Sequence, residues 1–289
     1  MYQVYFQITD NCNFQCRHCA YNCGPNGKTM SDKNIQRVLN NLSAETLDIF
    51  FTGGEPLSKK STLISALTYL KQKRESILPK GKVHVQTNGF WIQNQKSAYE
   101  TLSTLYDLGV NVLDIASFDK YHEEQGLDLP KLERDEHSPL EQALKKLINE
   151  SGVGNPITIY TSSTANEGVI PIGRAKELPK EEYAPEMICV LPNHFKDNNK
   201  LVMIDPDGQT HLCVAKTIPP IGSALEIPID ELIDNARKDQ ILRILMKSGL
   251  AVAVQFMGTE FSSQEEFDQY RRNACINCTE AFKDYSLQL

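Results

Sequence analysis

The sequence predicts an α/β fold: an open, partial (β/α)6 barrel over residues 1–180, followed by a small α+β domain over residues 181–289. Strand-like and helix-like patterns alternate through the first part, which indicates parallel strands joined by right-handed crossovers. About six such units are present, fewer than the eight of a closed barrel. Beyond residue 179 the alternation stops and a short hairpin pattern appears. A doubly wound sheet is the alternative arrangement of the same units.

The predicted strands of the first part are short runs rich in aromatic and β-branched side chains. In chain order they cover residues 2–9, 47–51, 83–87, 110–117, 157–161 and 169–172. The intervening helices are predicted from apolar residues at helical spacing, and they cover about 31–42, 63–70, 95–108 and 140–148. In either arrangement, active residues are expected at the C-terminal ends of the strands.

The second part begins near residue 180. Two short strands, 201–204 and 211–214, flank the segment 205–208, whose Asp-Pro-Asp-Gly sequence is typical of a turn. Helices are expected around 230–248 and 263–272.

Composition excludes several classes of protein. The formal net charge is -7 and the pI is about 5.5, with no basic run, so nucleic acid is not an expected partner. Neither a membrane-spanning run nor a signal peptide is evident, which favours a cytoplasmic protein without a membrane partner. In a reducing compartment the eight cysteines are expected to bind metal rather than form disulfides.

Three of those cysteines, Cys12, Cys16 and Cys19, directly follow the first strand. Soft thiolates suit iron–sulfur clusters or zinc. Three thiolates can hold three irons of a [4Fe–4S] cluster and leave the fourth iron open for another ligand. Zinc with a fourth ligand from His18 or Cys23 is the alternative.

The Cys-x3-Cys-x2-Cys spacing resembles the signature of the radical S-adenosylmethionine (SAM) superfamily, and the resemblance extends over about the first 180 residues. It implies that the open iron binds the amino and carboxylate groups of SAM. Reductive cleavage would then give a 5′-deoxyadenosyl radical, which abstracts a substrate hydrogen atom. An electron donor such as flavodoxin or ferredoxin is implied as a partner.

Gly53, Gly54 and Glu55 end the second predicted strand. Glycines allow close approach of the backbone to a ligand, and a carboxylate can pair with an ammonium group. The segment resembles the family motif that contacts the methionine ammonium. A plain turn is the alternative.

Two further strand ends carry polar residues. Gln86 and Asn88 end the third strand, and Ser117 and Asp119 end the fourth. They resemble family positions that line the cofactor site, with Ser117 a candidate for the ribose. Turn and helix-cap roles are the alternatives for Asn88 and Asp119.

The carboxylate of SAM requires a cationic partner, and Arg134 and Arg174 are the candidates. Solvated surface charges are the alternative. His18 occupies a position that is usually aromatic in the family, which implies packing beside the cofactor. His122 is a candidate acid–base group or a surface residue. Cys23 is either a buried structural thiol, a hydrogen-atom donor or a spare ligand.

The remaining four cysteines are Cys189, Cys213, Cys275 and Cys278. Four thiolates saturate one cluster or one zinc ion. The hairpin cysteine and the terminal Cys-x2-Cys resemble the twitch domain, the short form of the SPASM domain, which holds one auxiliary [4Fe–4S] cluster. Eighteen residues separate Cys189 from Gly208, a longer gap than usual, so Cys189 is the least secure ligand.

The resemblance implies that a 5′-deoxyadenosyl radical starts the reaction, but it does not identify the substrate. Relatives with such C-terminal domains mostly modify ribosomally made peptides by cross-linking, thioether formation or epimerisation, and short ones include aminocyclitol dehydrogenases. The chain begins almost at its first strand, which lowers the expectation of a leader-peptide-binding domain. Peptide maturation is favoured, with a small-molecule dehydrogenase or isomerase, a non-catalytic electron carrier and a zinc-binding interaction protein as alternatives.

Overall fold

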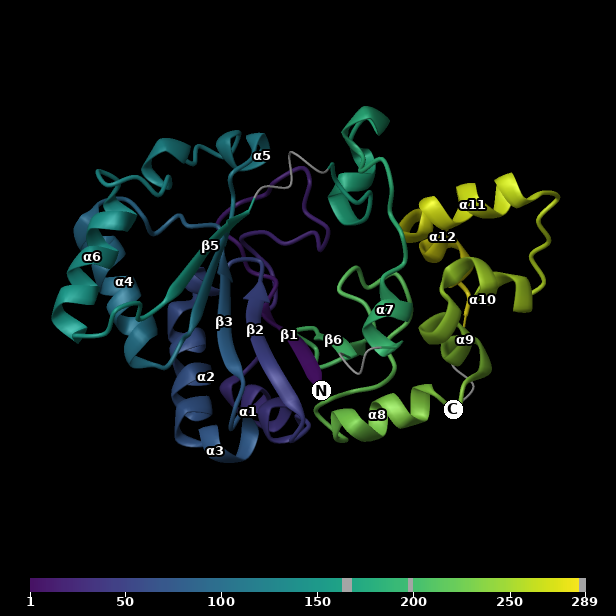
Figure 1. The fold of residues 1–289 in the computed structure, drawn as a ribbon, viewed down its shortest axis with the longest axis horizontal. Coiled ribbons are helices and arrows are strands. Elements are labelled where there is room, and N and C mark those ends of the chain that lie inside the picture. The colour runs from purple at the N-terminus through teal and green to yellow at the C-terminus, as the bar shows by residue number, and fades with distance from the viewer. Residues whose placement is uncertain (163–167, 197–199, 286–289) are drawn as a thin grey trace.

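The computed structural model of the chain describes residues 1–162, 168–196 and 200–285. Its strands form one sheet in the order β5-β4-β3-β2-β1-β6-β7 (Figure 1). All neighbouring pairs are parallel except β6 and β7. The strands are β1 (Tyr2–Thr9), β2 (Thr46–Gly53), β3 (Lys82–Thr87), β4 (Val112–Ala116), β5 (Thr158–Ser162), β6 (Lys200–Ile204) and β7 (Thr210–His211).

Helices flank this sheet and form a separate group near its β6 end (Figure 1). Those of the first part are α1 (Asp32–Asn40), α2 (Lys60–Gln72), α3 (Arg74–Ile77), α4 (Gln95–Asp107), α5 (Lys120–Glu123) and α6 (Pro139–Ser151). Those that follow are α7 (Leu191–Lys196), α8 (Ile229–Ala236), α9 (Gln240–Ser248), α10 (Leu250–Phe256), α11 (Gln264–Arg272) and α12 (Ala274–Ala281). Short 3-10 turns are η1 (Pro56–Lys59), η2 (Leu129–Lys131), η3 (Gly173–Glu177) and η4 (Lys180–Glu182).

The first five predicted strands are confirmed, and the sixth, at residues 169–172, is wrong. Val169 makes only an isolated bridge with Tyr183. Pro171 lacks the N–H that a ladder needs, and Gly173 has a φ of +58°, so the segment turns into η3 instead. Among the described residues, the sixth parallel strand is β6, which pairs with β1. The sheet therefore continues past residue 180, and the two-domain division stays a prediction.

The predicted hairpin forms, with a shorter second strand. Gly208 has a φ of +79° in the turn, and the Asp205 carboxylate accepts hydrogen bonds from the backbone N–H groups of Asp207 and Gln209. Strand β7 ends at His211, so Cys213 lies in the loop beyond it. The helix predicted at 230–248 is two helices, because Asp239 caps a new helix, α9. Helices α7, α10 and α12 were not predicted.

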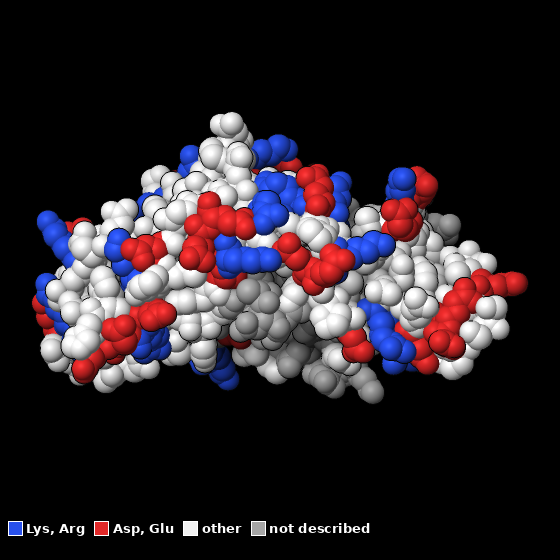
Figure 2. Space-filling model, turned by 90° about the horizontal axis from the view of Figure 1, so that it is seen from above, with Lys and Arg blue, Asp and Glu red and all other residues white. Residues whose placement is uncertain are grey.

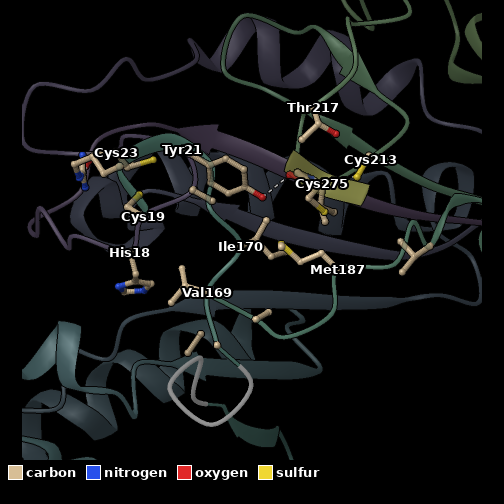
Figure 3. Close-up of a pocket in the computed structure, with 18 of the residues that line it drawn as sticks. His18, Cys19, Tyr21, Cys23, Val169, Ile170, Met187, Cys213, Thr217 and Cys275 are labelled. Atoms are coloured by element: carbon tan, nitrogen blue, oxygen red, sulfur yellow. Dashed lines mark hydrogen bonds between the residues drawn. The ribbon is translucent and has the colours of Figure 1, made fainter. Parts of the chain in front are cut away.

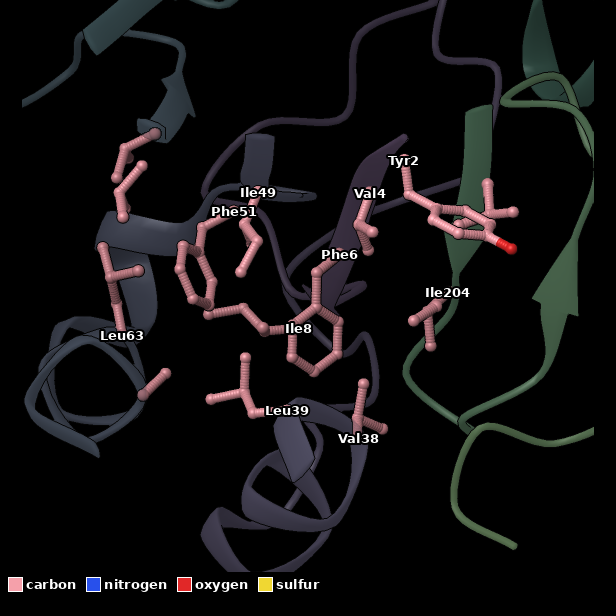
Figure 4. Close-up of a cluster of buried hydrophobic side chains, with 14 of the residues drawn as sticks. Tyr2, Val4, Phe6, Ile8, Val38, Leu39, Ile49, Phe51, Leu63 and Ile204 are labelled. Carbon is pink, nitrogen blue, oxygen red and sulfur yellow. The ribbon is translucent and has the colours of Figure 1, made fainter. Parts of the chain in front are cut away.

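One core cluster joins apolar side chains of the sheet to those of the helices that pack against it. Figure 4 shows alternate side chains of β1 and β2 pointing toward residues of α1 and α2. Val4, Phe6 and Phe51 are fully buried there, together with Leu39 and Leu63. Burial of each such side chain stabilises the fold by about 1.5–3 kcal/mol. This packing gives the C-terminal strand ends a rigid base.

The surface carries charges of both signs. Figure 2 shows acidic and basic side chains interspersed over the described part of one face, without a broad area of a single sign. Within the described residues, every helix is too short or too polar to cross a bilayer.

Candidate active site

The cysteine loop runs between β1 and α1 and is fastened to the end of β2. The Gly54 N–H donates to Thr9 O at 2.7 Å, and the Glu55 N–H donates to Asn11 O at 2.9 Å. A Cβ atom added to Gly54 would lie 2.4 Å from Asn11 O, and one added to Gly53 would lie 2.3 Å from Thr9 O. Both positions therefore require glycine, because the backbones touch.

A cavity of about 810 Å³ opens beside this loop (Figure 3). Cysteines from both ends of the chain line it, which joins two groups that are more than 160 residues apart in sequence. The lining cysteines are Cys12, Cys16, Cys19, Cys23, Cys189, Cys213, Cys275 and Cys278.

The thiols of the loop differ in their electrostatics. Burial raises the pKa of Cys12 to about 11 and that of Cys16 to about 12. A hydrogen bond from the Cys23 thiol, together with backbone N–H groups and Arg174, lowers the pKa of Cys19 to about 6 despite burial. Cys19 is thus the thiol of this loop that ionises most readily.

Arg174, in the segment after β5, donates hydrogen bonds to backbone carbonyl groups of the cysteine loop. Its Nε donates to Cys16 O at 3.0 Å, its Nη2 donates to Cys23 O at 2.8 Å, and its backbone N–H donates to Cys19 O at 3.0 Å. It also lines the cavity, so a cationic group stands beside the three thiols, and its predicted pairing with the carboxylate of SAM stays a prediction.

Glu55 points into the protein rather than into the cavity. Its carboxylate is fully buried and accepts hydrogen bonds from the Leu57 N–H at 2.9 Å, Thr87 Oγ1 at 2.9 Å and the Asn88 N–H at 2.6 Å. Burial raises its pKa to about 7, although these hydrogen bonds oppose the shift. This arrangement favours a positioning role that joins the ends of β2 and β3, and the predicted pairing with an ammonium group stays a prediction.

Of Gln86 and Asn88, the two residues predicted at the end of the third strand, only Asn88 lines the cavity. Its Nδ2 donates to Asn13 Oδ1 at 3.0 Å and lies 4.0 Å from Cys12 Sγ. Gln86 instead donates to Asp114 Oδ2 at 3.1 Å and is not part of the cavity wall.

Ser117, directly after β4, carries an unusual hydroxyl. The residue is fully buried, and among the described residues its Oγ has no hydrogen-bond partner. Ser117 is not itself among the residues that line the cavity, whereas the preceding residue, Ala116, is. Because an unsatisfied buried hydroxyl costs about 1–3 kcal/mol, a ligand hydroxyl at this point would be a favourable partner.

Replacing Ser117 with alanine is expected to have opposite effects on the free and the ligand-bound protein. The apo protein loses an unsatisfied hydroxyl and gains up to about 1 kcal/mol of stability. SAM binding weakens roughly five- to tenfold through the lost hydrogen bond. Thermal unfolding of the apo protein and equilibrium dialysis of SAM measure the two effects, and a destabilised apo variant would contradict the expectation.

Aromatic rings of the cysteine loop and α5 pack together, and those of Phe14, His18 and His122 line the cavity. The centroid of the His18 ring lies 4.5 Å from that of Tyr121 and 5.1 Å from that of His122. The centroids of the Phe14 and His122 rings lie 6.1 Å apart. Asp119 caps α5 and lies 3.0 Å from His122 Nδ1, which holds that ring in place and lowers the pKa of Asp119 to about 2 despite burial. Burial lowers the pKa of His18 to about 4, so its ring is neutral near pH 7.

The prediction that Arg134 belongs to this site is not supported by its position. Its Nη1 donates to Ile159 O at 3.0 Å, and its Nε lies 3.6 Å from Glu141 Oε2, both away from the cavity wall. Sequence analysis also missed Tyr21 and Lys216, which join the cysteine loop to the hairpin. No sequence motif marks either residue.

The four C-terminal cysteines are assembled by three segments. Cys213 follows β7, Cys275 and Cys278 lie on α12, and Cys189 precedes α7. The Met187 N–H donates to Arg272 O at 2.6 Å, and the Ala274 N–H donates to Met187 O at 2.9 Å, which holds the Cys189 segment against the start of α12. Cys189 therefore joins the other three despite the long gap in sequence.

Among the described residues, His18, Asp119 and His122 are the one group of three metal-binding side chains whose donor atoms all lie within 4.8 Å of one another. The choice between an iron–sulfur cluster and zinc at the C-terminal cysteines stays a prediction.

A family model described as the Radical SAM superfamily matches residues 6–161, more than half of the chain. The chain belongs to the radical SAM superfamily. As a radical SAM protein it is an enzyme, and the family implies a [4Fe–4S] cluster and SAM as cofactors. The thiols of the cysteine loop and the adjacent Arg174 line the cavity and fit those groups.

The chain is also similar to one curated protein and to several solved structures. A segment of 123 residues is 31% identical to YydG of Bacillus subtilis (strain 168), whose name assigns it to peptide biosynthesis; the match covers 41% of this chain and 36% of YydG. The crystal structure of BtrN in complex with AdoMet and 2-DOIA is 16% identical with a TM-score of 0.52, over 85% of this chain and 87% of BtrN. Native anSMEcpe with bound AdoMet and Cp18Cys peptide is 14% identical with a TM-score of 0.49, over 100% and 92% of the chains. The BtrN match confirms the open-barrel fold of a radical SAM enzyme.

Proposed function

We propose that this radical SAM enzyme abstracts a hydrogen atom from a residue of a ribosomally made peptide, bound in the cavity between the two cysteine groups. The observation that carries the proposal is the single cavity, because it lets one substrate face both groups. The similarity to YydG, a protein named for peptide biosynthesis, supports the substrate class.

In this proposal Cys12, Cys16 and Cys19 hold the cluster that binds SAM. When bound, the cluster and SAM supply a 5′-deoxyadenosyl radical by reductive cleavage, with the electron delivered by a flavodoxin or ferredoxin. Arg174 orients the carboxylate of SAM from its place against the loop, and Ser117 binds a ribose hydroxyl.

We assign Cys189, Cys213, Cys275 and Cys278 to an auxiliary [4Fe–4S] cluster, in a twitch-like second domain. Four thiolates leave that cluster no open iron, so it would transfer electrons or shape the substrate pocket. The four soft thiolates line one cavity, which supports this assignment.

The wall between the two cysteine groups favours a peptide over a polyol. Val169, Met187 and Ile218 are buried along it, and Ile170, Ile188 and Val190 stand 39%, 48% and 44% exposed. An aminocyclitol would need a hydrogen-bond partner for each buried hydroxyl and amine. An apolar wall instead suits an aliphatic or aromatic side chain of a peptide.

The position of Cys23 bears on whether the enzyme epimerises its substrate. The Cys23 thiol hydrogen-bonds to Cys19 and lies 3.9 Å from Gln7 Nε2, beside the proposed cluster ligand. A hydrogen-atom donor for epimerisation must reach the substrate face opposite the 5′-deoxyadenosyl group. Although Cys23 also lines the cavity, its thiol is engaged by Cys19 and Gln7, and we therefore favour an oxidative outcome, such as a cross-link or a thioether.

The test is anaerobic reconstitution followed by incubation with dithionite, SAM and the short peptides encoded beside the gene, in D2O. The expected products are 5′-deoxyadenosine and a peptide lighter by two hydrogen atoms. A peptide that gains one deuterium would show epimerisation instead. An unchanged set of peptides, with turnover of an aminocyclitol, would reject the peptide substrate in favour of small-molecule dehydrogenation.

The same reaction without substrate separates the remaining alternatives. An electron carrier would contain iron and form no 5′-deoxyadenosine, and a zinc-binding interaction protein would be colourless. We expect a brown protein that forms 5′-deoxyadenosine slowly without peptide, measured by iron analysis and chromatography.

A further inference from the structure

A polar cluster joins the C-terminal hairpin to the cysteine loop. Lys216 Nζ donates to Gln7 Oε1 at 2.7 Å and lies 4.7 Å from the centroid of the Tyr21 ring. Gln7 is fully buried near the C-terminal end of β1, where an amide without partners would be costly. Its Nε2 donates to Asp10 and lies 3.9 Å from Cys23 Sγ.

Cys23 extends this cluster to a proposed cluster ligand. Its thiol contacts Cys19 and also lies 3.9 Å from Asp10 Oδ1, a second acceptor for its single proton. A continuous series of contacts therefore runs from the Lys216 ammonium through Gln7 and Cys23 to the Cys19 sulfur. The reduction potential of an iron–sulfur cluster depends on the net charge around it and on hydrogen bonds to its sulfurs. A cation at the end of this series favours the more negative, reduced form of the cluster.

The backbone of the hairpin holds Lys216 in place. Its φ is +51°, a left-handed conformation that costs a residue other than glycine about 1 kcal/mol or more. Its N–H donates to Cys213 O at 3.1 Å, and the Tyr21 hydroxyl donates to Val214 O at 2.7 Å (Figure 3). The ammonium is thus positioned by the same loop that carries Cys213, a proposed ligand of the auxiliary cluster.

We propose that Lys216 is a positioning residue that raises the reduction potential of the N-terminal cluster through Gln7 and Cys23. Because its loop carries Cys213, assembly of the C-terminal site sets how readily the cluster accepts the electron that starts the reaction. Asp10 and Asp205 also face the ammonium and offset part of its charge. The inference deepens the proposed function, since it requires Cys12, Cys16 and Cys19 to hold the cluster.

The test is a redox titration of the reconstituted full-length protein, followed by electron paramagnetic resonance. The signal that changes on addition of SAM identifies the N-terminal cluster, because its open iron binds SAM. In Lys216→Met we expect the ratio of reduced to oxidised cluster, at a fixed applied potential, to fall at least tenfold, which is 59 mV for one electron. Lys216→Arg, which keeps the charge, should stay within threefold of the parent protein.

A matched control removes another cation from the same region. Lys28 pairs with Asp207 of the hairpin at 2.9 Å, and its side chain is 70% exposed. Lys28→Met should leave the potential unchanged, because solvent screens that charge. An unchanged potential in Lys216→Met, or an equal shift in Lys216→Arg, would overturn the proposal. The titration contains no substrate, so its result is independent of whether a peptide is the substrate.

Discussion

Replacing Cys12, Cys16 and Cys19 together with alanine is expected to reduce 5′-deoxyadenosine formation to background. The variant loses all three thiolates that the proposed site offers to the SAM-binding cluster. Without that cluster neither binding of the SAM amino and carboxylate groups nor electron delivery to SAM is possible. Chromatography of an anaerobic reaction with dithionite and SAM measures the product.

Iron analysis of the same variant tests the C-terminal site. About four irons should remain if the other cysteines hold a second cluster. The matched variant replaces Cys189, Cys213, Cys275 and Cys278 with alanine, and it should also retain about four irons. A cysteine-loop variant that contains no iron would reject the auxiliary cluster, and one that still cleaves SAM would reject the assignment of the loop.

The second large effect is expected at Gly54, where alanine should lower the rate of SAM cleavage about 100-fold or more. The added Cβ would lie 2.4 Å from the backbone oxygen of Asn11, next to Cys12, and neither backbone can yield without moving the loop. The same clash is expected to destabilise the protein by about 1–3 kcal/mol. Single-turnover formation of 5′-deoxyadenosine and the melting temperature measure the two effects.

Gly154 provides the control for this substitution. A Cβ atom there meets nothing within 4 Å, and its φ lies outside the left-handed region. Gly154→Ala should therefore retain parental activity and a melting temperature equal to or slightly above that of the parent. Parental activity in Gly54→Ala would show that the loop tolerates the displacement, contrary to the close approach in the structure.

Prediction from sequence was most accurate where the signal is local. The strands of the first part have distinctive apolar runs, and Cys12, Cys16 and Cys19 are close enough in sequence to identify a cluster loop. Asn88 and Arg174 were also predicted at the site, and they line its cavity. The strand predicted at 169–172 does not form, because Pro171 and the following Gly173 favour a turn over the strand propensity of their apolar neighbours.

The direction in which each polar side chain points could not be predicted from sequence. Glu55 and Gln86 lie at the correct strand ends, and the structure gives their polar groups protein partners instead of the cavity. Arg134 lies in a loop whose path depends on packing against β5 and α6, and that path leads away from the site. A pattern of residue types cannot decide such questions, because side-chain direction depends on partners distant in sequence.

The sequence by itself determined that this protein has three closely spaced cysteines at the end of a first strand and four further cysteines toward its C-terminus. Only the tertiary structure decided that both groups line one cavity. The physical reason is the parallel pairing of β6 with β1, which brings the hairpin carrying Cys213 beside the cysteine loop. No local pattern encodes that pairing, because it depends on contacts between segments about 200 residues apart.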